Sequence, residues 1–265
     1  MTYVVLCVFS AAALAPLVGL VLTALQPSGG LTGASQGAGT LDFQNFVRAW
    51  NAGDFGTGLR SSAIITVTVV VVSTILSIPS GYALGTMRFR GDTIIFSLFL
   101  LGLVMPIEAT IVPLYFDLRP LSLTDTYWGV ILPSIALSVA FGSFWMRAFF
   151  LSTPRSLVEA ARIDGASSWT TLRLVLLPIA RPAVLTMMVL VFMWTWNDFL
   201  TSLVMLSTPA IQTAPLKLAL FQGQHVTYLS ELAAGSLIVM LPVLVTYVFL
   251  QRHFIRGMLS GSVKG

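Results

Sequence analysis

The stretch that decides the fold is Glu159-Ala160-Ala161-Arg162-Ile163-Asp164-Gly165, followed by Val175-Leu176-Leu177-Pro178. It is a polar island between long apolar runs, in a chain of which 56% is hydrophobic and only 9% charged. Pro154 can occupy the first position of a helix without losing a hydrogen bond, and Ser156 with Glu159 has the spacing of a capping box. A helix is therefore expected to begin at this point, outside the apolar runs.

The end of this helix is also readable. Gly165 is expected to terminate it, because glycine adopts a left-handed backbone conformation without steric cost. A second short helix should begin at Ser167 or Ser168 and stop before Pro178. The segment 152–178 is thus predicted to form a helix-turn-helix.

The side chains of the first helix favour contact with another chain. Glu159 and Arg162 are three residues apart and share one helical face. Ala160 and Ala161 keep a neighbouring face small, so another backbone can approach closely. An ordinary interfacial amphipathic helix has a similar composition, so composition alone leaves both interpretations open.

The apolar stretches have the length of membrane-spanning helices. About 20 apolar residues cross a bilayer as a helix, and six stretches of that kind occur. They cover residues 3–25, 61–85, 93–116, 127–148, 179–203 and 232–251. We therefore predict an all-α, polytopic membrane protein with six transmembrane helices in a single domain over residues 1–265.

Charge predicts the orientation. Ten of the fourteen basic residues fall in the segments 87–92, 147–181 and 252–265. Because cytoplasmic loops are enriched in Lys and Arg, these segments should face the cytoplasm. Both termini and the helix-turn-helix are then cytoplasmic.

Enzymatic chemistry has little support in the sequence. No phosphate-binding Gly-x-x-x-x-Gly-Lys-Ser/Thr loop and no His-Glu-x-x-His motif occur, and the chain has two histidines and one cysteine. We expect no catalytic residue, no metal site and no cofactor in this chain.

The polar stretch resembles the EAA loop of permease subunits in ATP-binding-cassette (ABC) importers. That loop reads EAA, three residues, Gly, nine residues, an aliphatic residue, one residue and Leu-Pro, and Val175 here replaces the more usual Ile. Further stretches look like landmarks of binding-protein-dependent carbohydrate permeases of the maltose type. They are Tyr82-Ala83-Leu84, Arg88-Phe89-Arg90-Gly91, Met105-Pro106, Pro113-Leu114-Tyr115, residues 121–128, Trp196-Asn197-Asp198-Phe199, Leu241-Pro242, and residues 251–257 and 261–265.

This resemblance implies a permease subunit in a bacterial inner membrane that forms half of a pathway for a sugar or oligosaccharide. Its partners would be a second homologous permease, two ATPase subunits that bind ATP and Mg, an extracytoplasmic solute-binding protein and membrane lipid. No nucleic acid is expected, because the net charge of +4 is explained by the orientation of the loops. The residues expected to couple to the ATPase are Glu159, Ala160, Ala161, Arg162, Asp164, Gly165, Val175, Leu177 and Pro178. Glycerol-3-phosphate or a glycerophosphodiester is an alternative solute, and an ion-coupled secondary transporter is an alternative class.

Polar and aromatic residues in two predicted spans are candidates for the solute path. They are Glu108, Trp194, Trp196, Asn197 and Asp198. Acids and amides offer hydrogen bonds to hydroxyl groups, and an aromatic ring can cover the apolar face of a sugar. Trp194 and Trp196 point to different helix faces, so at most one should face the path. Glu108 could instead reach interfacial water, and Asp198 could instead cap a helix irregularity.

Overall fold

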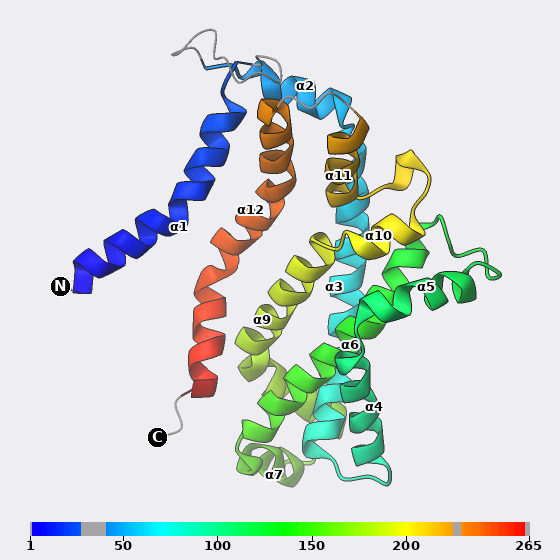
Figure 1. Cartoon of the computed structure of the whole chain (residues 1–265). Coiled ribbons are helices and arrows are strands. Elements are labelled where there is room, and N and C mark those ends of the chain that lie inside the picture. Colours follow the sequence, from blue (N-terminus) through cyan, green and yellow to red (C-terminus); the bar gives the residue numbers. More distant parts are fainter. Residues whose placement is uncertain (1, 28–40, 225–228, 263–265) are drawn as a thin grey trace. The chain divides into compact units, whose positions relative to one another are not determined.

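The computed structural model describes residues 2–27, 41–224 and 229–262, with side chains described for residues 3–27, 41–221 and 229–249. The described residues are mostly helical and contain no strand, in agreement with the predicted all-α class (Figure 1). The elements are α1 Thr2–Ala24, α2 Gln44–Ala52, α3 Phe55–Thr86, α4 Asp92–Val104, α5 Ile107–Leu118, α6 Tyr127–Ser152, α7 Arg155–Ile163, α8 Ser168–Thr170, the π-helix η1 Thr171–Leu176, α9 Leu177–Trp196, α10 Leu200–Met205, the 3₁₀ helix η2 Pro209–Ile211, α11 Ala214–Gln224 and α12 Leu229–Ser262.

Five helical stretches in the described part of the chain are long and apolar enough to cross a membrane. They are Tyr3–Ala24, Phe55–Thr86, Tyr127–Ser152, Ser168–Trp196 and Leu229–Phe249, and the pair α4 and α5 makes a sixth if it counts as one broken span. These stretches overlap the six predicted ranges. The C-terminal residues 263–265, part of the quoted C-terminal landmark, lie outside the described residues.

The third predicted span, 93–116, is wrong as a single helix. The chain bends by 101° between α4 and α5. Met105 has an extended backbone (φ −68°, ψ 123°), because a residue that precedes a proline is sterically disfavoured in the α conformation. Pro106 therefore ends α4 at Val104, and α5 runs in a new direction (Figure 1).

The fifth predicted span, 179–203, is also interrupted. The helix α9 ends at Trp196 and a separate short helix, α10, begins at Leu200. Asn197 is the C-cap residue of α9, and its N–H donates to the carbonyl oxygen of Met193. The break places Asn197 and Asp198 outside regular helix.

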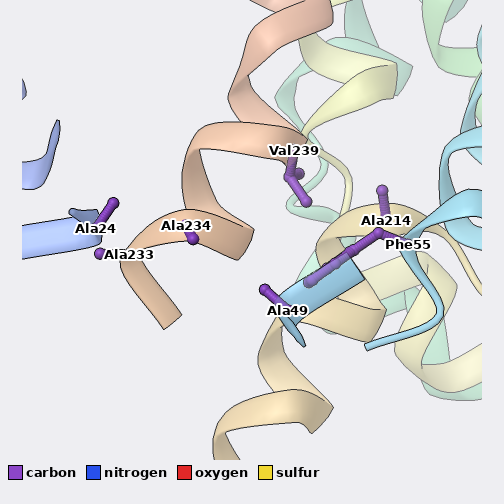
Figure 2. Packing of buried hydrophobic residues seen from close by; sticks show 7 residues of the cluster. All are labelled: Ala24, Ala49, Phe55, Ala214, Ala233, Ala234 and Val239. Atoms are coloured by element: carbon purple, nitrogen blue, oxygen red, sulfur yellow. The ribbon is translucent and has the colours of Figure 1, made fainter. Parts of the chain in front are cut away.

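The chain divides into two compact units. The first unit contains Met1–Ser62 and Thr208–Leu244. Its small apolar core gathers alanines around the fully buried Phe55, so that helix backbones approach closely (Figure 2). The buried members are Ala24, Ala49, Phe55, Ala214, Ala233, Ala234 and Val239.

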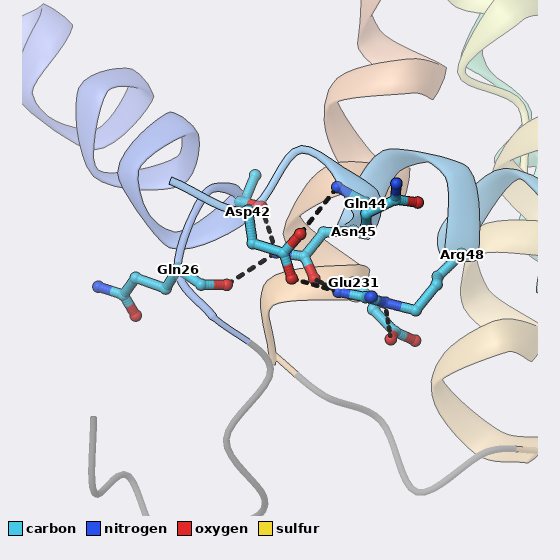
Figure 3. A network of polar contacts seen from close by, with 7 residues as sticks. Gln26, Asp42, Gln44, Asn45, Arg48 and Glu231 are labelled. Carbon is cyan, nitrogen blue, oxygen red and sulfur yellow. Dashed lines mark hydrogen bonds and ion pairs between the residues drawn. The ribbon is translucent and has the colours of Figure 1, made fainter. Parts of the chain in front are cut away.

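A polar network in the same unit links the end of α1 to α2 and α12 (Figure 3). Asn45 is fully buried, and its side-chain amide donates to the carbonyl oxygens of Ala24 (2.8 Å) and Gln26 (2.7 Å). Arg48 forms ion pairs with Asp42 (2.5 Å) and Glu231 (3.1 Å). Its hydrogen bond also holds the pKa of Asp42 below the ordinary value. The network satisfies the backbone groups at the end of α1.

A second ion pair in this unit fixes α11. The ammonium of Lys217, 6% exposed, lies 2.5 Å from a carboxylate oxygen of Asp54, which is 58% exposed. The hydrogen bond from Lys217 lowers the pKa of Asp54, and a second one from Thr57 adds to the effect. A buried cation without such a partner would be costly.

The second unit contains Ala63–Ser207 and Val245–Gly265. Within it, small residues bring α3 and α6 together. A Cβ added to Gly81 would lie 2.5 Å from Cβ of Met146, and the hydroxyls of Ser80 and Ser143 are hydrogen-bonded at 2.5 Å. Close backbone approach at glycine and serine is typical of helix pairs in membranes.

Candidate functional site

The turn after α7 has the geometry of a Schellman motif. Gly165 has φ +77°, and its N–H donates to the carbonyl oxygen of Arg162 at 3.0 Å, while the N–H of Ala166 donates to that of Ala161 at 2.9 Å. These two bonds satisfy carbonyls that the helix end would leave unpaired. The predicted role of Gly165 as the helix terminator is confirmed.

The start of α7 differs from the prediction. Pro154 is the N-cap residue rather than the first helical residue, and α7 begins at Arg155. No side chain caps this end, so the capping box expected from Ser156 and Glu159 is wrong. The extended backbone of Pro154 (ψ 127°) separates α7 from α6 instead.

The second predicted helix does not stop before Pro178. Ser167 caps its start, since its hydroxyl accepts from the N–H of Thr170 at 3.2 Å. The chain then continues through η1 into α9, and Ser168–Trp196 forms one span of 29 residues. Pro178 is the second residue of α9, directly after the π-helical turn η1 ends at Leu176. The π-helical turn of η1 contains Val175, one of the predicted coupling residues.

The predicted coupling residues are mostly accessible. Glu159, Ala160, Arg162, Asp164, Gly165 and Pro178 are exposed, Val175 and Leu177 are half-buried, and Ala161 is buried. Between them lies Ile163, a large apolar side chain that is 86% exposed, and Trp169 is 63% exposed. We define α7 together with the turn through Ser167 as the coupling segment. It exposes charged and apolar side chains close together.

Only two of the five residues predicted for the solute path line the same cavity. Trp194 and Asp198 line a cavity of about 380 Å³ with Phe141 and Ser138 of α6. The rings of Trp194 and Phe141 meet edge to face, with centroids 4.6 Å apart. The full lining is Leu103, Met105, Ile107, Pro133, Ser134, Leu137, Ser138, Phe141, Trp194, Thr195, Asp198 and Thr201. We call this the Trp194 cavity.

The break between α9 and α10 uses both polar residues for local hydrogen bonds. A carboxylate oxygen of Asp198 accepts from the N–H of Thr201 at 3.1 Å and so caps α10. The side-chain amide of Asn197 donates to the carbonyl oxygen of Met193 at 2.8 Å. Asp198 therefore combines a capping role with a place in the cavity wall, whereas Asn197 is exposed and absent from that wall.

Two further candidates are not part of the cavity. Trp196 is 4% exposed and stacks on Phe192, with ring centroids 5.6 Å apart. Glu108 is exposed in the first turn of α5, where a carboxylate is favoured by the helix dipole. Trp194 lines the cavity and Trp196 does not, and the expectation that at most one of them faces the solute path stays a prediction.

The sequence interpretation missed the wall contributed by α6. Ser134, Ser138 and Phe141 are spaced by four and three residues, so they share one face of that helix. Two serines on one face of an otherwise apolar helix could have indicated from the sequence that this face lines a cavity. The distance of more than fifty residues between Phe141 and Trp194 left no local sign that their rings meet.

Metal-binding chemistry is not supported by the described residues. No group of three or more His, Cys, Asp or Glu side chains in them could hold a metal ion. Cys7, on α1, is a free cysteine.

The long apolar helices of the described residues are those of a polytopic membrane protein. Residues 77–260 match the family model described as the binding-protein-dependent transport system inner membrane component. The chain belongs to this family of transport permeases.

Relatives and a solved structure agree with this assignment. The chain is 34% identical over 256 residues to the arabinooligosaccharides transport system permease protein AraQ of Halalkalibacterium halodurans, covering 94% of this chain and 91% of that one. It is 31% identical over 255 residues to the trehalose transport system permease protein SugB of Mycobacterium tuberculosis, covering 96% and 93%. A crystal structure of a bacterial ABC transporter involved in the import of the acidic polysaccharide alginate is similar, with a TM-score of 0.78, 27% identity and coverage of 96% and 95%.

Proposed function

We propose that this chain is the permease subunit of an ATP-driven importer for a neutral sugar or oligosaccharide. It forms half of the membrane pathway beside a second homologous permease. Two ATPase subunits bind ATP and Mg on the cytoplasmic side, and an extracytoplasmic binding protein delivers the solute. The observation that carries this proposal is the exposed coupling segment, which presents Glu159, Arg162 and Ile163 next to a rigid Schellman turn.

The mechanism follows from the continuous helix between the coupling segment and the cavity. Ser168–Trp196 is helical throughout, so Trp194 lies about 40 Å along the axis from Ser168 at roughly 1.5 Å per residue. A displacement of the coupling segment by the ATPase is therefore transmitted along α9 without an intervening loop. ATP binding draws the segments together and opens the pathway outward, and hydrolysis resets it.

The choice of a neutral solute rests on the charges of the Trp194 cavity. Its wall contains the carboxylate of Asp198 and no Lys, Arg or His. An anionic glycerol-3-phosphate or glycerophosphodiester would meet a like charge there. A sugar hydroxyl, in contrast, finds Ser138, Thr195 and Asp198 as hydrogen-bond partners, while Trp194 and Phe141 cover its apolar face.

The test is uptake by proteoliposomes that contain the complete importer or this chain alone. We expect ATP-dependent uptake of a neutral oligosaccharide only with the ATPase and the binding protein present, and no loss of uptake when the proton gradient is collapsed. Gradient-driven uptake by this chain alone would establish a secondary transporter instead. Competition by glycerol-3-phosphate at low concentration would contradict the neutral-solute assignment.

A further inference from the structure

A second cavity, of about 610 Å³, lies behind the coupling segment. It is lined by the end of α3, the start of α4, the end of α6 and one side of α7. Four arginines reach its wall, against two acids. The residues are Leu84, Gly85, Thr86, Met87, Arg88, Asp92, Thr93, Arg147, Phe150, Leu151, Thr153, Arg155, Val158, Glu159, Arg162 and Leu176. We call it the arginine cavity.

The positive charge of this cavity is not neutralised by the residues around it. In the described part of the chain, Arg88, Arg155 and Arg162 form no ion pair with an acidic side chain. One of the two acids is already engaged, since an oxygen of Asp92 accepts from the N–H (2.6 Å) and the hydroxyl (3.0 Å) of Thr93. The wall therefore carries an excess of two positive charges.

Backbone dipoles do not offset this excess. The helices α3 and α6 end at the cavity, which places partial negative charge there, while α4 and α7 begin at it and place partial positive charge. The two pairs of helix ends oppose each other. The side-chain charges then decide the sign of the potential, which is positive.

The guanidinium of Arg147, in the cavity wall, is fixed by two contacts within the chain. Its Nε donates to the carbonyl oxygen of Leu84 at 3.2 Å, and its Cζ lies 3.9 Å from the centre of the Phe96 ring. A guanidinium fixed in this way loses little conformational entropy when its remaining N–H groups bind an oxyanion.

The helix α4, whose first two residues line the cavity, also carries an exposed apolar face. No residue of α4 is buried, and its side chains Ile94, Leu98 and Leu101 are 68%, 61% and 59% exposed. This face begins one residue after Thr93, which lines the cavity. A ligand with a phosphate group and attached acyl chains is complementary to both features. Its phosphate can bind the arginines of the cavity, and its acyl chains can pack on the apolar side chains of α4.

We propose that the arginine cavity binds the phosphodiester headgroup of an anionic phospholipid of the cytoplasmic leaflet, with its acyl chains along α4. The proposal rests on the cytoplasmic placement of the coupling segment given under the proposed function. It adds a lipid site that steadies the base of α7 where force from the ATPase enters. Occupancy of this site is independent of which solute the importer carries.

The test compares phospholipid retained by the purified importer from nanodiscs of phosphatidylcholine mixed with phosphatidylglycerol, counted by native mass spectrometry. The double variant Arg88→Gln with Arg155→Gln removes two charges from the cavity. The matched control, Arg90→Gln with Arg173→Gln, removes two charges from exposed cytoplasmic residues that do not line it. We expect roughly thirtyfold weaker retention of phosphatidylglycerol in the double variant and little change in the control.

Several results would overturn the site. They are equal losses in both double variants, no preference of the wild type for phosphatidylglycerol, or binding of inorganic phosphate by the same arginines in phosphatidylcholine nanodiscs. Loss of the ATPase subunits with unchanged lipid retention would assign the cavity to the ATPase instead. If the double variant does not insert, the single variants Arg88→Gln and Arg155→Gln test the same point, with roughly fivefold weaker retention expected for each.

The lipid proposal and the solute proposal can be contradicted independently of each other. An importer that proved to carry an anionic solute would still be expected to retain phosphatidylglycerol through Arg88 and Arg155. Conversely, unchanged lipid retention in the variants would contradict the lipid site but would not contradict ATP-dependent sugar uptake.

Discussion

Charged side chains of the first unit form ion pairs within the chain, whereas those of the coupling segment in the second unit form none with a described residue. In the first unit, Arg48 pairs with Asp42 and Glu231, and Lys217 pairs with Asp54. In the coupling segment of the second unit, Glu159 and Arg162 are exposed and form no ion pair with another described side chain. Charges that are paired within the chain stabilise it, whereas the exposed charges of Glu159 and Arg162, which both line the arginine cavity, remain available to another molecule.

The same contrast applies to aromatic residues, and the largest expected effect follows from it. Trp196→Ala removes a buried, stacked ring, so we expect a loss of about 3–5 kcal/mol of stability and a lower yield of assembled complex. Trp194→Ala removes a ring that is 54% exposed and lines the cavity. It should leave the yield nearly unchanged and weaken solute uptake. Complex yield and uptake per complex, measured together, distinguish the two, and a parallel loss of both in Trp194→Ala would contradict its place in the path.

The next effect concerns the turn of the coupling segment. A side chain at Gly165 would meet nothing within 4 Å, so Gly165→Val should insert normally. Its β-branched side chain is strained at φ +77° by about 1–2 kcal/mol, which should lower ATP-driven uptake roughly tenfold. The control is Gly165→Asn, because asparagine tolerates the left-handed region. Full uptake by the valine variant would show that the Schellman turn is not needed for coupling.

A matched pair of glutamates tests the contrast between paired and outward charges directly. Glu231→Gln removes the partner of Arg48 and should lower stability by up to about 1 kcal/mol, without a change in uptake per folded complex. Glu159→Gln should leave thermal unfolding unchanged and reduce the stimulation of the ATPase by solute. Glu159→Lys should reduce it further, because the charge is reversed beside the ATPase. A stability loss in Glu159→Gln equal to that in Glu231→Gln would remove the distinction.

The smallest expected effect is a pH dependence in the first unit. The hydrogen bond from Lys217 lowers the pKa of Asp54 in the folded state, so the unfolded chain binds the proton more readily. The contribution of this pair is then fully present above the unfolded pKa of about 4 and is lost as the pH falls through the lower folded pKa. The unfolding midpoint of the wild type should fall between about pH 5 and pH 3, and that of Asp54→Asn should fall less. Equal slopes for both proteins would exclude Asp54 as the titrating group.

The helix end at Gly165 could be predicted from the sequence, because the interactions that form it are local. Gly165 follows a helix of nine residues, and its left-handed conformation and the Schellman bonds involve neighbours within five positions. The continuation of the second helix through Pro178 was not predicted. A proline is compatible with the first turn of a helix, so its presence could not decide between a stop and a start.

The breaks in the third and fifth predicted spans show a different limit. Pro106 was visible, but apolar composition alone cannot separate a straight span from two helices at 101°. The interruption at Asn197 has no proline or glycine. The sequence allowed it only as the alternative in which Asp198 caps a helix irregularity, and the hydrogen bond from the N–H of Thr201 to Asp198 confirms that alternative.

The sequence by itself determined the class of this protein. Length and apolarity indicate membrane helices, the basic residues predict their orientation, and the spacing from Glu159 to Pro178 predicts, by its resemblance to the EAA loop, a segment that docks to an ATPase. Only the tertiary structure decided which residues share a cavity. Trp194 meets Phe141, and Arg88 lies at the same cavity as Arg155, because helix packing brings together side chains whose separation along the chain carries no local signal.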